Sequence, residues 1–140
     1  MAEQTGRPHS GYAEHIGYDL TRRETGFAEV TLVVGPQHLN RSNIPHGGLL
    51  ATLLDTAAGF AIAFAEGAET VKPAVTLSLS ILYLGQAKQG DTLIATGRHT
   101  GGGRTVGFAT SEIRTQDGTA VARAEGVFRY LGVKGLRDKG

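Results

Sequence analysis

The 140-residue sequence contains no cysteine and no tryptophan, and it has one methionine and four prolines. The absence of cysteine excludes disulfides, thiol nucleophiles and thiolate metal sites, and it is compatible with a reducing compartment. Fourteen basic and 13 acidic residues leave a formal net charge of +1, without the basic surplus of a dedicated nucleic-acid binder. We therefore expect a cytoplasmic protein with no nucleic-acid partner.

Long apolar runs are also scarce. The first 19 residues, "MAEQTGRPHSGYAEHIGYD", are polar and lack the apolar core of a signal peptide. The one membrane candidate, residues 49–65, is barely long enough to span a bilayer and carries Asp55 at its middle. We therefore expect no membrane partner.

The remaining pattern predicts a single α+β domain over residues 1–140, with loose ends at 1–13 and 133–140. Strands are predicted at 16–26 and 27–35, a loop at 36–45, and a helix at 47–65 that is apolar all round. Four more strands, at 74–85, 91–100, 105–115 and 119–131, are predicted to form an antiparallel meander. In the first of these, alternation puts one apolar set on a common face, opposite Thr76: Val75, Leu77, Leu79, Ile81 and Tyr83. A curled sheet wrapped around one buried helix follows.

Residues 40–55 carry the strongest chemical pattern. Gly47 and Gly48 open the predicted helix, where unpaired N–H groups and the positive end of the helix dipole favour a ligand oxygen. From local sequence alone, a plain turn after Pro45 is an equally good interpretation of the two glycines. Asp55 is the one charged residue between 49 and 65, and a carboxylate in such a place needs a partner or a function.

Other chemistries find weaker support. No serine lies in a G-x-S-x-G motif, and His38 and His46 do not have the spacing of a zinc-binding H-E-x-x-H helix. Gly101-Gly102-Gly103 is not followed by the Lys of a phosphate-binding loop, so a hairpin turn is the better interpretation. We expect no metal and no cofactor. His38 and His99 are interpreted as loop or surface residues, and Phe60, Ile62 and Phe64 as core.

The pattern N-x5-HGG-x6-D at the start of an apolar helix, followed by a strand ending "ILYLGQAKQGD", resembles a known family. It is similar to the hotdog-fold acyl-CoA thioesterases of the phenylacetate (PaaI-like) group, within the 4-hydroxybenzoyl-CoA thioesterase superfamily. The resemblance covers roughly residues 15–132 in element order. It implies a hotdog fold, in which a curled antiparallel sheet wraps one long helix, and it implies hydrolysis of an acyl- or aryl-acyl-coenzyme A thioester, with coenzyme A as part of the substrate.

The resemblance also implies roles for individual residues. Asp55 matches the catalytic carboxylate, acting as nucleophile or as general base on water. Gly47 matches the residue whose N–H polarises the thioester carbonyl, with His46 beside it and Asn40 helping to place the water or the carbonyl. Thr76 falls where relatives carry a hydroxyl that supports the water. Gly48, Gly103 and Arg104 match substrate-binding positions, the last two near the coenzyme A phosphates.

Two alternatives stay open at this level: a hotdog module that binds acyl-CoA or an acyl carrier without catalysis, and a hydratase or dehydratase on the same fold. The resemblance further implies a homodimer or homotetramer with shared active sites. In such an assembly, Asp55 of one chain faces Asn40, His46 and Gly47 of another.

Overall fold

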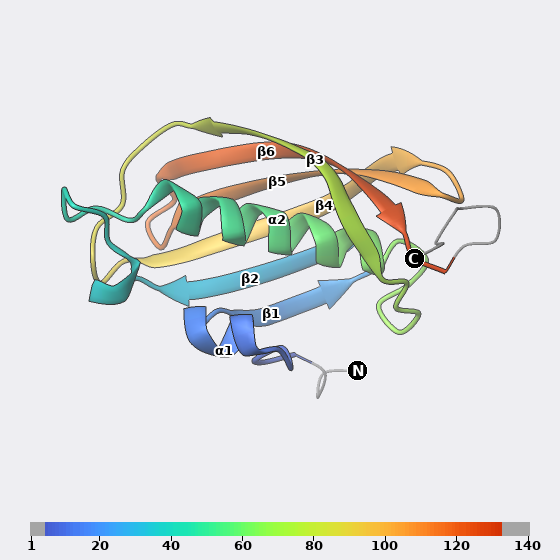
Figure 1. Cartoon of the computed structure of the whole chain (residues 1–140), viewed down its shortest axis with the longest axis horizontal. Coiled ribbons are helices and arrows are strands. Elements are labelled where there is room, and N and C mark those ends of the chain that lie inside the picture. The colour runs from blue at the N-terminus through green and yellow to red at the C-terminus, as the bar shows by residue number, and fades with distance from the viewer. Residues whose placement is uncertain (1–4, 133–140) are drawn as a thin grey trace.

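The computed structural model describes residues 5–132. Its elements follow the order α1 (Gly11–Ile16), β1 (Asp19–Glu24), β2 (Phe27–Val33), the 3-10 turn η2 (Pro36–His38), α2 (Gly47–Ala63), β3 (Ala74–Tyr83), β4 (Thr92–Gly102), β5 (Val106–Thr115) and β6 (Ala120–Tyr130). The six strands form one antiparallel sheet that curls around α2 (Figure 1). The predicted α+β architecture is therefore confirmed.

The strand order corrects the predicted meander. The sheet runs β1-β2-β4-β5-β6-β3, so β3 pairs with β6 rather than with the next strand in the chain. The segment after β3 crosses the end of the sheet and delivers β4 beside β2 (Figure 1). Because β3 has a partner on one side only, it forms an edge of the sheet, as β1 does at the other side.

Helix α2 packs its small apolar residues directly against the concave face of the sheet. Leu53, Leu54, Ala57 and Ala58 have no exposed surface. Contact with β4 is so close that a Cβ atom placed on Gly97 would lie 2.1 Å from the Ala57 carbonyl oxygen. Ile62 and Phe64 are also buried and Phe60 packs against the core, which confirms their predicted role.

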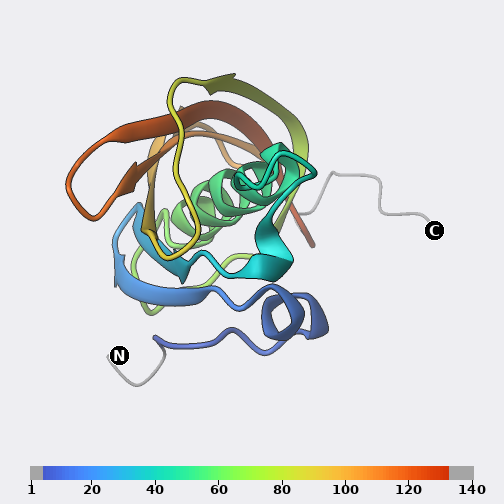
Figure 2. The same cartoon turned by 90° about the vertical axis from the view of Figure 1, so that its left-hand side faces the viewer.

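One stripe of α2 departs from the prediction of a helix buried on all sides. The stripe of partly exposed residues recurs at helical spacing and comprises Ala51, Thr52, Asp55, Thr56, Gly59 and Phe60. The sheet is curled but not closed, so its two edges leave this side of α2 uncovered in the single chain (Figure 2). The helix therefore has a polar, accessible side, and Asp55 lies on it.

Residues 5–13 are more ordered than the predicted loose leader, whose first four residues lie outside the described range. Gly6 forms a β-bridge with Leu20, and helix α1 is capped by Ser10, whose Oγ accepts the Ala13 N–H. Gly17 ends the helix in the left-handed conformation, at φ 95°, which glycine adopts without strain. The predicted loose end at 133–140 lies outside the described residues. No helix within residues 5–132 has the length and apolar character needed to cross a bilayer.

Candidate active site

The N-terminus of α2 presents one unused backbone donor. The His46 side chain caps the helix by accepting the Gly48 N–H at Nδ1, 2.7 Å away. The N–H groups of Leu49 and Leu50 both donate to the His46 carbonyl oxygen. Within residues 5–132 the Gly47 N–H has no hydrogen-bond partner. Of the two predicted glycines, Gly47 therefore keeps a donor for a ligand, whereas the Gly48 donor is occupied.

The capping bond also fixes the His46 ring. Because Nδ1 accepts a hydrogen bond, the proton of the neutral imidazole lies on Nε2, at the exposed side of the residue. His38, interpreted from the sequence as a loop or surface residue, is 5% exposed. Its two ring nitrogens contact the Gly35 N–H and the Ile16 carbonyl oxygen, so it ties α1 to the loop before α2. His38 therefore lies in the predicted loop, as expected, but is buried there rather than on the surface.

Asn40 shapes the same loop. Its Oδ1 accepts the N–H groups of Ser42 and Ile44 at 2.8 and 3.3 Å, and Asn43 completes the turn with a φ of 62°. Since the amide oxygen is engaged, the Asn40 side chain can offer only its NH2 group, which donates to no described residue. The loop therefore holds Asn40 as a donor near the start of α2.

Asp55 lies two turns further along α2, with Thr76 beside it. The Thr76 hydroxyl donates to Asp55 Oδ1 over 2.6 Å. A β-bulge makes this contact possible, because the β3–β6 register shifts between Thr76 and Ser78 and leaves Leu77 unpaired. The bulge turns Thr76 toward α2 and breaks the predicted alternation, so that Val75 and Leu77 are exposed while Leu79 packs on the core.

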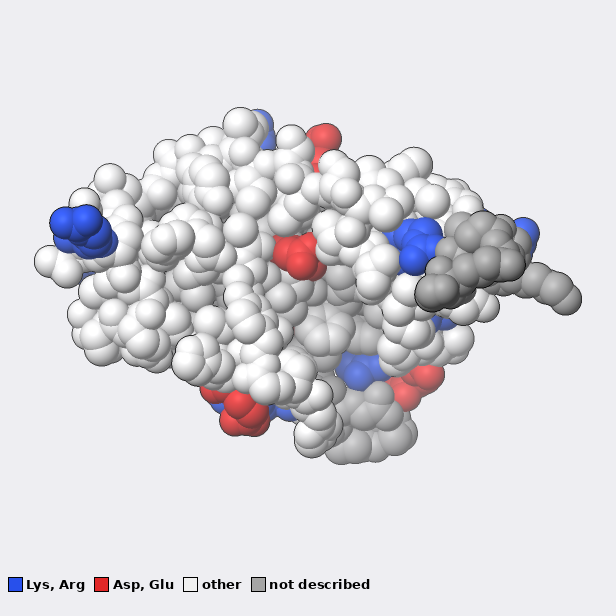
Figure 3. All heavy atoms as spheres, viewed as in Figure 1, with Lys and Arg blue, Asp and Glu red and all other residues white. Residues whose placement is uncertain are grey.

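Two grooves flank the accessible side of α2. We call the first the α1 groove. It encloses about 610 Å³ between α1 and β3, and its lining includes Tyr12, Tyr18, Thr52, Asp55, Thr76 and Leu79. The second, the loop groove, encloses about 380 Å³ and its lining includes Asn40, Gly47, Leu50, Tyr83 and Leu84. Charged side chains are sparse on this face of the molecule, where an acidic group stands near the centre (Figure 3). A further depression of about 660 Å³, on the face of the sheet turned away from α2, holds none of the predicted site residues.

The predicted residues thus fall into three places in one chain. Asp55 and Thr76 lie together in the α1 groove, and Asn40, His46, Gly47 and Gly48 gather at the start of α2. Gly103 and Arg104 form the turn between β4 and β5, at the opposite end of the sheet from the loop before α2 (Figure 1).

Two tyrosines near the site were not predicted. The Tyr83 hydroxyl donates to the Gly47 carbonyl oxygen over 3.0 Å, and the Tyr12 hydroxyl lies 2.6 Å from Thr52 Oγ1. Their partners are 36 and 40 residues away in the sequence, so no local pattern reports these contacts. The closest signal for Tyr83 was its place at the end of an apolar strand.

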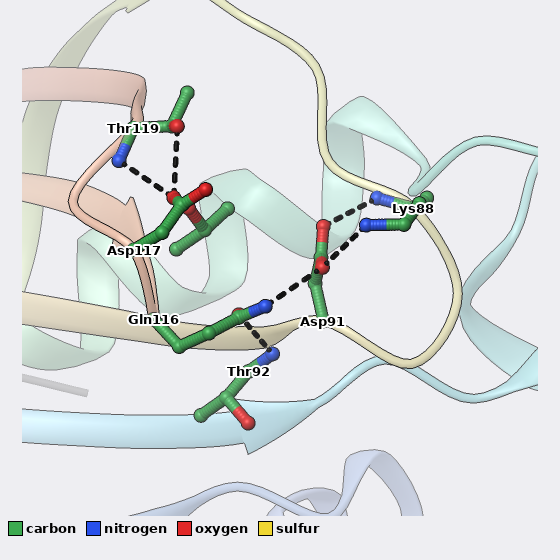
Figure 4. A network of polar contacts seen from close by, with 7 residues as sticks. Lys88, Asp91, Thr92, Gln116, Asp117 and Thr119 are labelled. Atoms are coloured by element: carbon green, nitrogen blue, oxygen red, sulfur yellow. Dashed lines mark hydrogen bonds and ion pairs between the residues drawn. The ribbon is translucent and has the colours of Figure 1, made fainter.

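A second carboxylate cluster lies at the loop end of the sheet and is saturated with donors (Figure 4). Asp91 accepts the Lys88 N–H, the Lys88 ammonium and the Gln116 amide, at 2.9, 3.0 and 3.1 Å. The Lys88 N–H, then Gln116 and the Lys88 side chain, hold the pKa of Asp91 below its ordinary value. Nearby, hydroxyl groups of Thr115 and Thr119 lower the pKa of Asp117 to about 2. In the part of the chain that the structure describes, no three His, Asp or Glu side chains are grouped to hold a metal ion.

A curled sheet around one helix, with a carboxylate on the helix and an N–H at its start that has no partner among residues 5–132, is the arrangement expected of a hotdog-fold thioester hydrolase. The model of the thioesterase superfamily matches residues 43–122, and the chain belongs to this family. The match includes His46, Gly47, Asp55 and Thr76, and it confirms the resemblance seen in the sequence.

Individual relatives agree with this assignment. The chain is 34% identical over 120 residues to the acyl-coenzyme A thioesterase PaaI of Escherichia coli, covering 86% of this chain and 82% of that protein. The solved structure of that protein superposes with a TM-score of 0.81 at 32% identity, covering 89% of this chain and 86% of the other. A putative esterase of Pseudomonas aeruginosa is 36% identical over 99 residues, 71% of this chain and 72% of that protein. A Streptococcus pneumoniae hypothetical thioesterase, solved with coenzyme A, gives a TM-score of 0.75 at 30% identity over 82% of this chain and 89% of that one.

Proposed function

We propose that the protein hydrolyses acyl-coenzyme A thioesters at sites in which Asp55 provides the attacking oxygen and Gly47 N–H binds the carbonyl oxygen. The observation that carries this proposal is the pair of unsatisfied groups on one side of α2. Asp55 has a single donor among the described residues, Thr76, and the Gly47 N–H has no acceptor there. Similarity to thioesterases that act on or bind coenzyme A compounds supports the choice of substrate.

The chemistry needs no group beyond these. If Asp55 acts as a base, it takes a proton from water, the water oxygen attacks the carbonyl carbon, and the carbon–sulfur bond breaks. The coenzyme A thiolate then recovers the proton. If Asp55 itself attacks, its oxygen bonds to the carbonyl carbon as the carbon–sulfur bond breaks and the coenzyme A thiolate leaves; water then cleaves the resulting anhydride to the free acid and Asp55, and a proton from that water goes to the thiolate. A single turnover in ¹⁸O-labelled water that leaves labelled oxygen in Asp55 would establish the anhydride route, because only attack of water on the Asp55 carbonyl of an anhydride places the label there.

One chain cannot complete the site alone. Gly47 and Asp55 are eight residues apart on a continuous helix, which places them about 12 Å apart along its axis. A reacting carbonyl must lie roughly 3 Å from both the attacking oxygen and the donor to its own oxygen. We therefore propose that Asp55 of one chain faces Gly47, His46 and Asn40 of a second copy.

The edge strand β3 is the surface that best fits this second copy. It carries exposed apolar side chains, among them Leu77, Leu82 and Tyr83 at 53–56%, and such an edge favours pairing with another strand. The other edge, β1, bears charged residues and is partly covered by the bridge from Gly6. On β3, Thr76 contacts Asp55 and Tyr83 contacts Gly47. A two-fold axis between these positions would bring Thr76 of one chain to the partner's Tyr83, and hence Asp55 to the partner's Gly47.

The same two-fold arrangement would also determine where the coenzyme A part of the substrate lies. The C-terminal end of α2, near the β4–β5 turn, would lie toward the end of the partner that carries the loop before α2. Gly103 and Arg104 of one chain could then reach the nucleotide phosphates of a substrate bound at the partner's Gly47. A homotetramer would join two such dimers, with each chain acting as one domain.

The direct test measures free thiol released from a panel of acyl- and aryl-coenzyme A thioesters by the wild-type protein and by Asp55→Asn. We expect release by the wild type and a large loss in the variant. Binding of the thioesters without thiol release would instead support a non-catalytic module. Hydration of an enoyl-coenzyme A without thiol release would support a hydratase.

Sharing of the site is tested by mixing two inactive variants. Asp55→Asn and Asn40→Ala are coexpressed, and mixed dimers are verified by two affinity tags. One shared site then inherits both defects and the other neither, so with random pairing about a quarter of the wild-type activity should return. If each site lay within one chain, no activity would return, and the shared-site proposal would be refuted while the role of Asp55 remained.

A further inference from the structure

When the reacting carbonyl of a thioester lies at Asp55, the acyl group and the coenzyme A part must extend from it in different directions. The described residues that line the α1 groove include one charged side chain, Asp55 itself, and no cation. Beside the loop groove, Arg41 lines an adjoining depression with Asn40 and His46. Because coenzyme A carries phosphates and an acyl group carries none, the charge distribution in the shared site proposed above points the coenzyme toward the loop of the second copy and the acyl group toward α1 of the chain that carries Asp55.

Helix α1 closes the far side of the α1 groove with an aromatic wall. Thr52 donates its hydroxyl proton to the Gly48 carbonyl oxygen, so in the contact with Tyr12 the tyrosine must be the donor. The hydrogen bond thereby fastens Tyr12 to Thr52 of α2, three residues or just under one turn before Asp55, although 54% of Tyr12 is exposed. Tyr18 lines the same groove at 6% exposure and makes no hydrogen bond to any residue between 5 and 132.

From this geometry we infer that α1 forms the acyl end of the site and that Tyr12 limits the length of the acyl group that fits. The inference rests on the proposed thioesterase function and adds a specificity-determining residue to it. An acyl group that passes Asp55 would run between the Tyr12 ring and Leu79 and end against α1. Short acyl groups fit within this space, whereas long unbranched chains would have to displace Tyr12 from Thr52.

The arrangement of α1 supports a rigid wall. The Ser10 cap, the Gly17 terminus and the contact between His38 and the Ile16 carbonyl oxygen hold both ends of the helix. Ala13, a residue of α1 itself, is completely buried and packs the helix onto the core. A wall fixed at both ends discriminates by size, because it cannot yield to a longer chain without breaking several contacts.

The test compares kcat/KM across straight-chain acyl-coenzyme A thioesters of increasing length. We expect Tyr12→Ala to raise kcat/KM for chains longer than the wild-type optimum about tenfold or more relative to the optimum, the scale of one or two methylene groups in a pocket. Tyr12→Phe keeps the ring and loses only the bond to Thr52, so the wild-type order of chain lengths should persist. Phe108→Ala removes an aromatic ring of similar exposure on β5, outside both grooves, and should leave the profile unchanged.

The outcomes separate this inference from the function on which it rests. An active Tyr12→Ala variant with the wild-type chain-length profile would overturn the inference and leave the thioesterase proposal intact. A wild-type protein that releases no thiol from any thioester would overturn both. Should Tyr12→Ala fold poorly, as judged by circular dichroism and melting temperature, Tyr12→Leu provides a smaller apolar side chain with the same expected direction of change.

Discussion

Asp55 and Asp91 are two carboxylates placed in opposite ways. Asp91 is buried in a loop cluster where three donors from Lys88 and Gln116 occupy its oxygens. Asp55 is partly exposed on a helix and has one described donor, Thr76. A carboxylate whose hydrogen-bonding capacity is filled stabilises the fold, whereas one with a free oxygen beside a groove can act on a ligand. In this protein the number of hydrogen-bond donors around each carboxylate distinguishes the structural Asp91, with three, from the candidate catalytic Asp55, with one among the described residues.

The largest effect should come from exchanging each carboxylate for an amide. Asp55→Asn keeps an oxygen that can accept the Thr76 hydroxyl but removes the base, so kcat should fall by a factor on the order of 10²–10⁴. Asp91→Asn places an amide NH2 among donors and should lower the melting temperature by a few degrees while kcat stays near the wild-type value. Steady-state kinetics and thermal melts on both variants check the contrast, which an Asp55→Asn variant of normal kcat would break.

The contrast extends to the two glycines at the start of α2. A Cβ atom on Gly47 would meet the Tyr83 ring and hydroxyl at 3.5–3.6 Å, an ordinary contact, whereas on Gly48 it would lie 2.9 Å from His46 Nδ1. Gly47→Ala should therefore fold normally and lose turnover roughly 10²-fold by crowding the carbonyl. Gly48→Ala should disturb the helix cap and lower the melting temperature. An unfolded Gly47→Ala variant, fully active in its folded fraction, would indicate that Gly47 only turns the chain.

The sequence predicted the start of α2 and Asp55 because helix signals and their spacing are local. The sequence did not predict the hydrogen bond between Thr76 and Asp55. That contact depends on a bulge at Leu77, which arises from pairing with β6 and reverses the alternation expected along the strand. The sequence also placed β3 next to β4, because the choice of β6 as partner follows from the closure of the whole sheet. Tyr12 and Tyr83 could not be found, as their roles depend on residues 40 and 36 positions away.

Removing the one donor that the described residues offer to Asp55 tests the comparison more closely. Thr76→Val keeps the shape of the side chain and leaves Oδ1 without the Thr76 hydroxyl. We expect kcat to fall about tenfold, the scale of one hydrogen bond to a charged group, and the assembly to persist. Ser78→Ala, on the other side of the bulge, is the matched control and should retain normal kcat. Equal kinetics in the two variants would show that Thr76 does not support the carboxylate during reaction.

Two cations at opposite ends of the sheet can be compared in substrate binding. Lys88 forms an ion pair with Asp91 in the loop cluster, and Arg104 lies at the β4–β5 turn, where we propose a coenzyme A phosphate. Arg104→Ala should raise KM several-fold for full coenzyme A thioesters and leave pantetheine thioesters, which lack the nucleotide, unaffected. Lys88→Ala should change neither KM. A rise of equal size for both kinds of substrate in Arg104→Ala would rule out the phosphate contact.

The smallest effect concerns acid stability at the donor-rich end of the sheet. The hydroxyl groups of Thr115 and Thr119 lower the pKa of Asp117 in the folded protein to about 2, from an ordinary value of 3.8, and the pKa of Asp91 is lowered as well, first by the Lys88 N–H. A carboxyl group whose pKa is lower in the folded state contributes stability above its unfolded pKa and loses it as the pH falls toward the folded value. The free energy of unfolding should therefore decline between about pH 4 and pH 2. Asp117→Asn should flatten this decline in denaturant titrations at successive pH values; an Asp117→Asn variant with the full wild-type slope would show that the saturated cluster does not govern acid stability.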